Sequence, residues 1–204
     1  MPKIEKITKQ TENPYVNLYL VEGKNKVDHL FRYYVASRAK TMEALKIKTK
    51  KNTPDGVLMY SLYGEKRDKI VLVRQYRVSI DDYIYEFPAG LVESGEEFHE
   101  AAVREMHEET GLTFHPLKVD PCYEKPFFTT IGMTDEACSA VYGWCEGEIS
   151  RKYLEESEVI EVVLADREEA KRILRILKEE NVAIMCSYHL MHFIHDEEPF
   201  AFLK

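Results

Sequence analysis

The segment that most constrains the fold is one amphipathic helix set among strand-like runs. Residues 97–110 are rich in helix formers, and Gly111 follows them where a glycine commonly ends a helix. Runs rich in valine, tyrosine and isoleucine, typical of strands, stand on both sides of it at residues 56–64, 69–77, 83–90, 137–148 and 159–165. Because helices and strands mix without regular βαβ alternation, we expect an α+β fold, with a mixed sheet layered between helices.

The flanking regions add a second small sheet and two further helices. Residues 15–21 and 28–37 are strand-like runs around the turn sequence GKNK, which predicts a small antiparallel β domain. Near the other end, apolar residues recur at helical spacing, which predicts helices over 167–180 and 182–195. We place the domain boundary in the lysine-rich stretch between the N-terminal strands and the central block. This gives an N-terminal β domain over 1–52 and a second domain over 53–204.

Composition and charge exclude several classes of protein. The 204 residues are 45% hydrophobic and 31% charged with few glycines and prolines, as in an ordinary globular chain. A net charge of −8 argues against nucleic acid as a partner, although local arginines or a divalent cation can still attract a small anion. No apolar run suits a signal peptide or a membrane span, and the four cysteines show no CxxC pair. We therefore expect a cytoplasmic protein with reduced thiols and no membrane contact.

The acidic residues of the helix at 97–110 do not lie opposite its apolar side. At about 100° per residue, Ala102, Val103 and Met106 form one apolar sector. Three carboxylates border or overlap that sector, at Glu105, Glu108 and Glu109. A solvated acidic face is the ordinary explanation of such a helix, but carboxylates held half-inside repel one another and need compensation by a cation or by arginine. Oxygen ligands of this kind suit Mg²⁺ or Mn²⁺, often together with substrate phosphates.

The spacing of these residues resembles a family signature. Residues 90–112 read GLVESGEEFHEAAVREMHEETGL, which matches at every defined position the pattern Gx5Ex7REUxEExGU of the Nudix hydrolases, where U is aliphatic. The flanking sequences VLVRQYR and YEFPAG look like the ADP-ribose pyrophosphatase branch of that family. The resemblance implies a Nudix fold, an α/β/α sandwich around a mixed sheet. It also implies hydrolysis of a nucleoside diphosphate linked to another group.

The resemblance further implies roles for individual residues. The metal ligands would be the carbonyl of Ala89 and the carboxylates of Glu105, Glu108 and Glu109. Arg104 would pair with neighbouring acids and orient them, and Arg77 would grip a substrate phosphate as a planar bidentate donor. Further substrate-binding positions would be Glu86, Leu91 and Gly132.

A second loop offers a proton acceptor. The sequence TTIGMTDEA at 129–137 holds Gly132 and resembles the family's glycine-containing loop that ends in an acidic residue. In several members this glutamate is the general base, which implies that role for Glu136. Members differ in which carboxylate takes the proton, so Glu96, Glu105 and Glu109 remain alternatives.

The resemblance as a whole implies a Mg²⁺-dependent hydrolase, with Mn²⁺ as a second metal, that cleaves ADP-ribose to AMP and ribose 5-phosphate. In this branch the N-terminal β domain commonly builds a homodimer. One alternative is a pyrophosphatase for another nucleotide sugar, such as GDP-mannose or UDP-glucose, because the signature fixes the diphosphate chemistry and not the base. The other is a Nudix-like module that senses a nucleotide without cleaving it.

Overall fold

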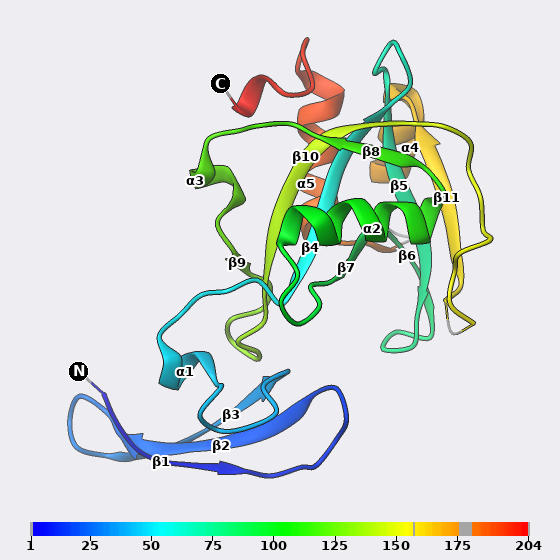
Figure 1. Ribbon diagram of the computed structural model, residues 1–204. Coiled ribbons are helices and arrows are strands. Elements are labelled where there is room, and N and C mark those ends of the chain that lie inside the picture. The colour runs from blue at the N-terminus through cyan, green and yellow to red at the C-terminus, as the bar shows by residue number, and fades with distance from the viewer. Residues whose placement is uncertain (1, 157, 176–180, 204) are drawn as a thin grey trace. The chain divides into compact units, whose positions relative to one another are not determined.

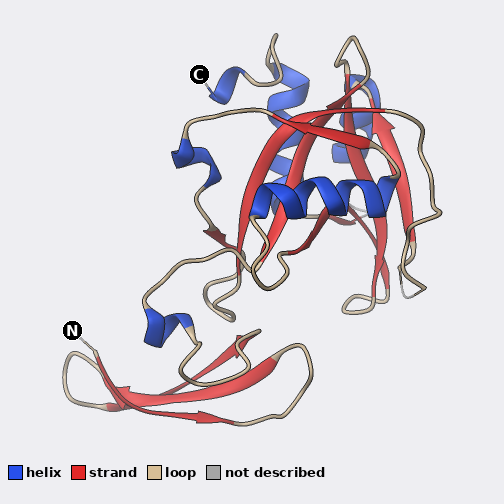
Figure 2. Ribbon diagram, in the orientation of Figure 1, coloured by secondary structure: helices blue, strands red, loops and turns tan. Residues whose placement is uncertain are grey.

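The chain divides into two compact units (Figures 1 and 2). This computed structural model describes residues 2–156, 158–175 and 181–203. The N-terminal unit comprises Met1–Asp55 and Pro126–Cys138, and the larger unit comprises Gly56–Lys125 and Ser139–Lys204. The segment Pro126–Cys138, which carries two of the predicted site residues, therefore groups with the N-terminal unit.

The N-terminal unit is built on an antiparallel sheet of β1 (Lys3–Lys9), β2 (Asn17–Lys24) and β3 (Leu30–Ser37). Alternate residues of β2 are buried, Tyr19 and Val21 among them, as expected for a sheet with one covered face. The unit also holds the short helix α1 (Lys46–Thr49) and the strand β9 (Phe127–Phe128), which pairs with the first two residues of β10. The predicted N-terminal antiparallel sheet is thus confirmed.

The larger unit is a mixed sheet with strand order β12-β6-β5-β4-β10-β8, in which β7 also pairs with β4 and β11 with β5. The β12–β6 pair is parallel, whereas the pairs of β5 are antiparallel. The strands are β4 (Gly56–Tyr63), β5 (Lys69–Arg77), β6 (Asp82–Glu86), β7 (Ala89–Leu91), β8 (Thr113–Pro116), β10 (Ala137–Glu146), β11 (Ile160–Ala165) and β12 (Asn181–Val182). The helices are α2 (Phe98–Thr110), α3 (Pro121–Glu124), α4 (Arg167–Arg175), α5 (Ile184–His195) and the 3₁₀ turn η1 (Ala201–Leu203).

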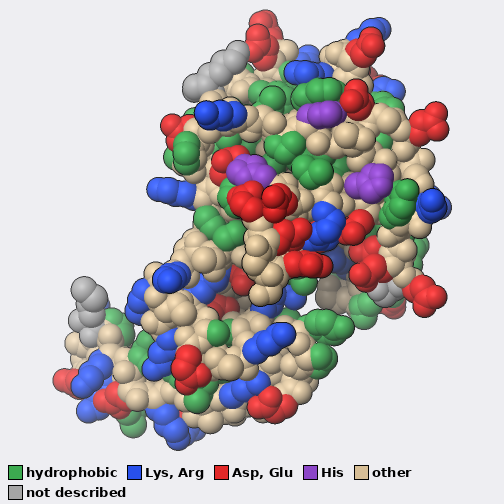
Figure 3. All heavy atoms as spheres, in the orientation of Figure 1, with side chains coloured by type: hydrophobic (Ala, Val, Ile, Leu, Met, Phe, Trp, Pro, Cys, Tyr) green, Lys and Arg blue, Asp and Glu red, His purple; other side chains and the backbone are tan. Residues whose placement is uncertain are grey.

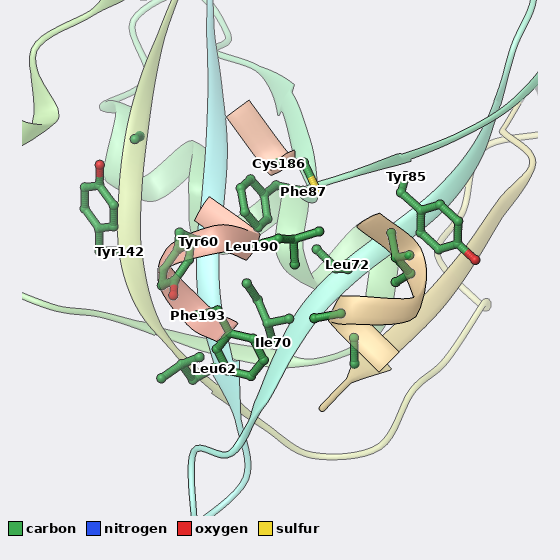
Figure 4. Packing of buried hydrophobic residues seen from close by; sticks show 14 residues of the cluster. Tyr60, Leu62, Ile70, Leu72, Tyr85, Phe87, Tyr142, Cys186, Leu190 and Phe193 are labelled. Carbon is green, nitrogen blue, oxygen red and sulfur yellow. The ribbon is translucent and has the colours of Figure 1, made fainter. Parts of the chain in front are cut away.

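Helices cover both faces of this sheet. Successive side chains of its central strands point in opposite directions, so each strand contributes to two cores. Met59 and Val71 pack in one core with Met106 of α2. Their neighbours along β4 and β5 pack in a second core with residues of α4 and α5, shown in Figure 4. The predicted α+β fold with a mixed sheet between helices is confirmed.

The predicted helices agree with the structure in position and differ at their ends. In α2 the Glu97 side chain caps the first turn by accepting from the His99 amide, and Gly111 ends the helix at φ +78°. Val103 is 39% exposed, so its predicted place in the apolar sector is wrong; Ala101, on the other side of Ala102, is buried instead. The predicted helix over 167–180 corresponds to α4, whereas residues 176–180 lie outside the described residues.

Two further properties of the described residues bear on the sequence-based expectations. The four cysteines are all free thiols. In the part of the chain that the structure describes, no helix has both the length and the apolar composition needed to cross a lipid bilayer.

The second core contains a histidine that makes stability depend on pH. His189 is 8% exposed, lies among aromatic rings including Tyr60 at 5.0 Å between ring centroids, and contacts the Met185 carbonyl through Nδ1 at 3.0 Å. Burial lowers the pKa of His189, and the nearby His192 lowers it further. Below the ordinary histidine pKa of about 6.5 the unfolded chain therefore binds a proton that the folded chain resists.

We expect the contribution of His189 to the free energy of unfolding to fall as pH decreases from 7 to 5. The stability of the wild-type protein relative to His189→Phe, which keeps a ring in the cluster, should therefore fall over this range. Urea unfolding of both proteins at several pH values measures this difference. An identical pH dependence in the two proteins would show that His189 does not contribute to it.

Candidate active site

A short loop joins strand β7 to helix α2 in the larger unit. Gly90 of β7 lies opposite Val57 of β4, and the chain then turns through Gly95 at φ +87°. Reciprocal hydrogen bonds between Glu93 and Glu96 close this turn, at 2.9 Å and 3.1 Å. The turn is short, so it returns the chain directly into α2 and fixes the helix beside β7.

Arg104 is the centre of a hydrogen-bonded cluster of acids. Its Nε and one terminal nitrogen contact the two oxygens of Glu96, both at 2.9 Å, in a bidentate fork. The other terminal nitrogen donates to Glu105 at 2.8 Å and to Glu108 at 2.9 Å. A further bond reaches the Leu91 carbonyl at 3.0 Å. The predicted pairing of Arg104 with neighbouring acids is observed, and Figure 3 shows acidic side chains gathered on this face.

Glu109 is the most deeply placed of these carboxylates. It is 3% exposed, and one oxygen accepts a hydrogen bond from the Ala89 amide at 3.0 Å. Burial raises its pKa well above the ordinary value, and repulsion from Glu105 and Glu158 adds to the effect, while Arg77 opposes it. The pKa of Glu105 is raised too, chiefly by burial. A negative charge at Glu109 therefore needs a cation to be stable there.

Gly90 allows the Glu105 carboxylate to lie close against the backbone of β7. A Cβ built on Gly90 would lie 1.9 Å from the carboxyl carbon of Glu105, so any side chain there displaces that carboxylate. The need for space around the Glu105 carboxylate thus explains why the first residue of the signature is glycine. It leaves space for Glu105 beside β7.

Arg77 and Glu86 form a pair on the same face of the sheet as α2. Along β5, Arg77 has the same orientation as Val71, which packs against α2. Its Nε donates to Glu86 at 2.7 Å, and the side chain is 44% exposed. Arg77 can therefore receive an anion from solvent while Glu86 holds its orientation.

The loop with the predicted general base belongs to the N-terminal unit. The Glu136 carboxylate accepts from Arg38 Nε at 2.7 Å and from the Thr129 hydroxyl at 3.2 Å. The carbonyl of Gly132 accepts from the Tyr33 hydroxyl, and a Cβ on this glycine would meet open space. Their places in an active site remain predictions.

One acidic residue near the cluster was missed by the sequence reasoning. Glu158 is half-buried in the segment between β10 and β11, and its charge raises the pKa of both Glu105 and Glu109. The sequence offers no signal for it, because this segment matches no part of the signature. It adds a negative charge within electrostatic range of Glu105 and Glu109.

The carboxylates of the cluster offer oxygen atoms, which are the ligands that a hard divalent cation binds. Within residues 2–156, 158–175 and 181–203, no three acidic, histidine or cysteine side chains converge as a metal centre requires, since Glu105 and Glu108 are turned onto Arg104. However, the buried Glu109 is repelled by both Glu105 and Glu158, and all three are oxygen donors. A divalent cation would offset this repulsion, and carboxylates are the ligands that Mg²⁺ takes in proteins.

Comparison with known proteins assigns the chain to a family. The model of the Nudix domain matches residues 52–184, more than half of the chain. The chain belongs to the Nudix family. As a Nudix protein it carries the complete signature on β7, the following loop and α2.

Individual relatives of this Nudix chain confirm the resemblance to the ADP-ribose pyrophosphatase branch. It is 34% identical over 110 residues to an ADP-ribose pyrophosphatase of Bacillus subtilis, covering 52% of this chain and 56% of that one. It is 32% identical over 108 residues to an ADP-ribose pyrophosphatase of Saccharomyces cerevisiae, covering 52% and 47%. The chain thus spans about half the length of these curated relatives. A crystal structure of an ADP compounds hydrolase shares the fold, with a TM-score of 0.62, 18% identity, and coverage of 85% of this chain and 83% of that one.

Proposed function

We propose that this Nudix protein is a divalent-cation-dependent pyrophosphatase that cleaves ADP-ribose to AMP and ribose 5-phosphate. The observation that carries the proposal is the set of acids at the buried edge of α2, with Glu109 nearly inaccessible and Glu105 against Gly90. The names of the relatives from Bacillus subtilis and Saccharomyces cerevisiae support the choice of substrate. Mg²⁺ is the proposed metal, and Mn²⁺ would serve in its place.

The carboxylates of the cluster would bind the metal, and Arg104 would orient them. Glu105, Glu108 and Glu109 would hold the cation, with the carbonyl of Ala89 as a further ligand. When bound, the cation neutralises charge on the diphosphate and polarises the phosphorus. Arg104 orients Glu105 and Glu108 through the bonds described above, and it keeps their charges balanced before a cation enters.

The remaining groups bind the substrate and move the proton. Arg77, steadied by Glu86, would contact diphosphate oxygens, with Leu91 and Gly132 against the substrate. Water attacks one phosphorus, the bond from that phosphorus to the bridging oxygen breaks, and the water proton passes to a carboxylate. Glu136 is the proposed acceptor from the family resemblance, and Glu158 is a second candidate because it lies within electrostatic range of Glu105 and Glu109.

Substitution separates these two candidates. We expect the general base, changed to glutamine, to lose about 10²- to 10⁴-fold in kcat, as removal of a proton acceptor does, with little change in KM. Glu136→Gln and Glu158→Gln should therefore differ sharply in kcat for ADP-ribose. The variant with wild-type kcat excludes its residue, and wild-type kcat in both would return the role to Glu96, Glu105 or Glu109.

Gly90→Ala tests the close approach of Glu105. We expect it to reduce turnover about 10- to 100-fold, the range for a displaced metal-site group, because the new methyl group occupies the place of the Glu105 carboxylate. The carboxylate is the end of a flexible side chain, so thermal unfolding should change little. Gly64→Ala is the control for a glycine with open space around it, although its own φ of +77° costs some stability. Wild-type turnover in Gly90→Ala would show that the position of Glu105 does not matter.

A substrate panel tests the proposed function itself. The purified protein is incubated with ADP-ribose, GDP-mannose, UDP-glucose, NADH and coenzyme A, with and without Mg²⁺, and the products are identified by mass. Preferred release of AMP from ADP-ribose is the expected result. Preference for GDP-mannose or UDP-glucose would replace the substrate and keep the chemistry. Binding of a nucleotide without cleavage of any compound would overturn the proposal in favour of a sensor.

The proposal includes a homodimer formed through the N-terminal unit and a cytoplasmic location. One face of the N-terminal sheet exposes the apolar side chains of Leu18, Leu30 and Tyr34, which the strand register places on the same side. Light scattering after gel filtration should give twice the chain mass. Leu30→Glu should shift the protein toward the monomer, and a monomeric wild-type protein would contradict this part of the proposal.

A further inference from the structure

The segment between β10 and β11 is attached to the end of α2, and it passes that helix on its way to β11 (Figure 1). The Ser150 amide donates to the carbonyl of Thr110, the last residue of α2, at 2.9 Å. A Cβ on Gly111 would lie 2.6 Å from the Ser150 nitrogen, so only glycine permits this approach. The attachment fixes where the segment begins.

A second attachment joins two aromatic rings. Tyr153 packs on His107 of α2, with ring centroids 4.6 Å apart and an interplanar angle of 39°. His107 lies on the exposed side of α2 and occupies one of the positions that the signature leaves undefined. The Lys152 ammonium group lies 5.3 Å from the Tyr153 ring centre and covers it further. This contact lies between Ser150 and Glu158 along the segment, so it restricts the path that the chain takes to Glu158.

The end of the segment is closed by a turn that orients Glu158. The Glu155 amide donates to the Glu158 carboxylate at 3.0 Å, and the Glu158 amide donates to the Glu155 carbonyl at 3.0 Å. The turn starts two residues after Tyr153, so the ring contact restrains the chain directly before the turn. The charge of Glu158 raises the pKa of both Glu105 and Glu109, so the turn holds this carboxylate within electrostatic range of the acidic cluster.

We propose that the His107–Tyr153 ring contact is a positioning device that holds the Glu158 carboxylate beside Glu105 and Glu109 for the reaction. This inference rests on the proposed function, with Glu158 acting on the attacking water or on its proton. Tyr153 and His107 are positioning residues that act through Glu158. The ring contact thus joins His107, which the signature leaves undefined, to a segment outside the signature.

Hydrogen exchange on the metal-free protein tests the structural half without reference to activity. We expect the Glu155 amide, which is bonded to Glu158, to exchange at least about 10-fold faster in Tyr153→Ala, because the turn loses its anchor. Tyr153→Phe keeps the ring and should exchange at the wild-type rate. Tyr188→Ala, which removes a tyrosine 58% exposed on α5, is the matched control. An unchanged Glu155 amide in Tyr153→Ala would overturn the positioning role.

Kinetics with ADP-ribose test the functional half. Tyr153→Ala should lower kcat by about 10- to 100-fold, the cost of a misplaced group, with KM changed less. Tyr153→Phe should restore kcat, and Tyr153→Ala should add nothing further in a Glu158→Gln background, because the two residues act through one carboxylate. Full additivity of the two substitutions, or wild-type kcat in Tyr153→Ala, would overturn the proposal. If the wild-type protein cleaves no substrate, the proposed function and the kinetic role both fail, while the exchange result still reports on the ring contact.

Discussion

Glu109→Gln should reduce hydrolysis of ADP-ribose about 10³-fold or more, because a carboxylate ligand supplies several kcal/mol of stabilisation to a metal-assisted transition state. The amide oxygen can still accept from Ala89, so the local structure is kept. Metal-free Glu109→Gln should be at least as stable as the wild-type protein. Turnover and stability are thus expected to change in opposite directions.

The sign of the stability change follows from the pKa of Glu109. Burial raises this pKa in the folded state, so the folded wild-type protein resists ionisation that the unfolded chain undergoes freely. Above the ordinary carboxyl pKa, Glu109 therefore makes the wild-type protein less stable as pH rises, and this contribution is absent from Glu109→Gln. The difference in unfolding free energy should grow from pH 4 to pH 7 and shrink again when Mg²⁺ is added.

The control for this substitution is Glu100→Gln, which changes an exposed acid in the first turn of the same helix. It should leave turnover within about twofold, since surface substitutions away from a site have small effects. Wild-type turnover in Glu109→Gln would remove Glu109 from the metal site and with it the basis of the proposed function.

Arg104→Ala should lower both stability and turnover. Its guanidinium contacts three carboxylates and one carbonyl, so its removal leaves three neighbouring acids without their common partner. We expect a loss of about 2 kcal/mol in unfolding free energy without metal and a fall in turnover of about 100-fold. Part of the lost stability should return with Mg²⁺, because a cation then offsets the released acids. Urea unfolding with and without Mg²⁺ measures both effects.

Arg104→Lys should recover little of this activity, because a single ammonium group cannot form the fork with Glu96 and still reach Glu105. Arg32→Lys is the matched control, since Arg32 is paired with one acid and its side chain is 75% exposed. It should cost less than about 1 kcal/mol. An Arg104→Ala protein as stable and active as the wild-type protein would show that the network of bonds is incidental.

Much of this cluster could be predicted because α2 is regular. Helical geometry placed Glu105 and Glu109 at the edge of the apolar face, and in the structure Glu109 is 3% exposed. The same geometry failed for Val103, whose angle lies just past the edge of the buried sector. The burial of residues near such an edge depends on the rotation of the helix about its axis against the sheet, and sequence periodicity does not determine that angle.

Other parts of the site depend on contacts between segments distant in sequence. The segment that carries Glu158 contacts α2 where Ser150 approaches Gly111 and where Tyr153 packs on His107, and neither contact leaves a periodic pattern. The grouping of residues 126–138 with the N-terminal unit depends on long-range pairing of the same kind. Strands β8 and β12 were missed because two to four residues are too few to show alternation.

The most direct test of the account is release of AMP from ADP-ribose by the wild-type protein after removal of metal with EDTA, measured by mass before and after addition of Mg²⁺. We predict negligible release without metal, stoichiometric AMP and ribose 5-phosphate with Mg²⁺, and almost none from Glu109→Gln under either condition. Equal release with and without Mg²⁺, or no release from a protein that binds ADP-ribose, would contradict a metal-dependent hydrolase built on the carboxylates of α2.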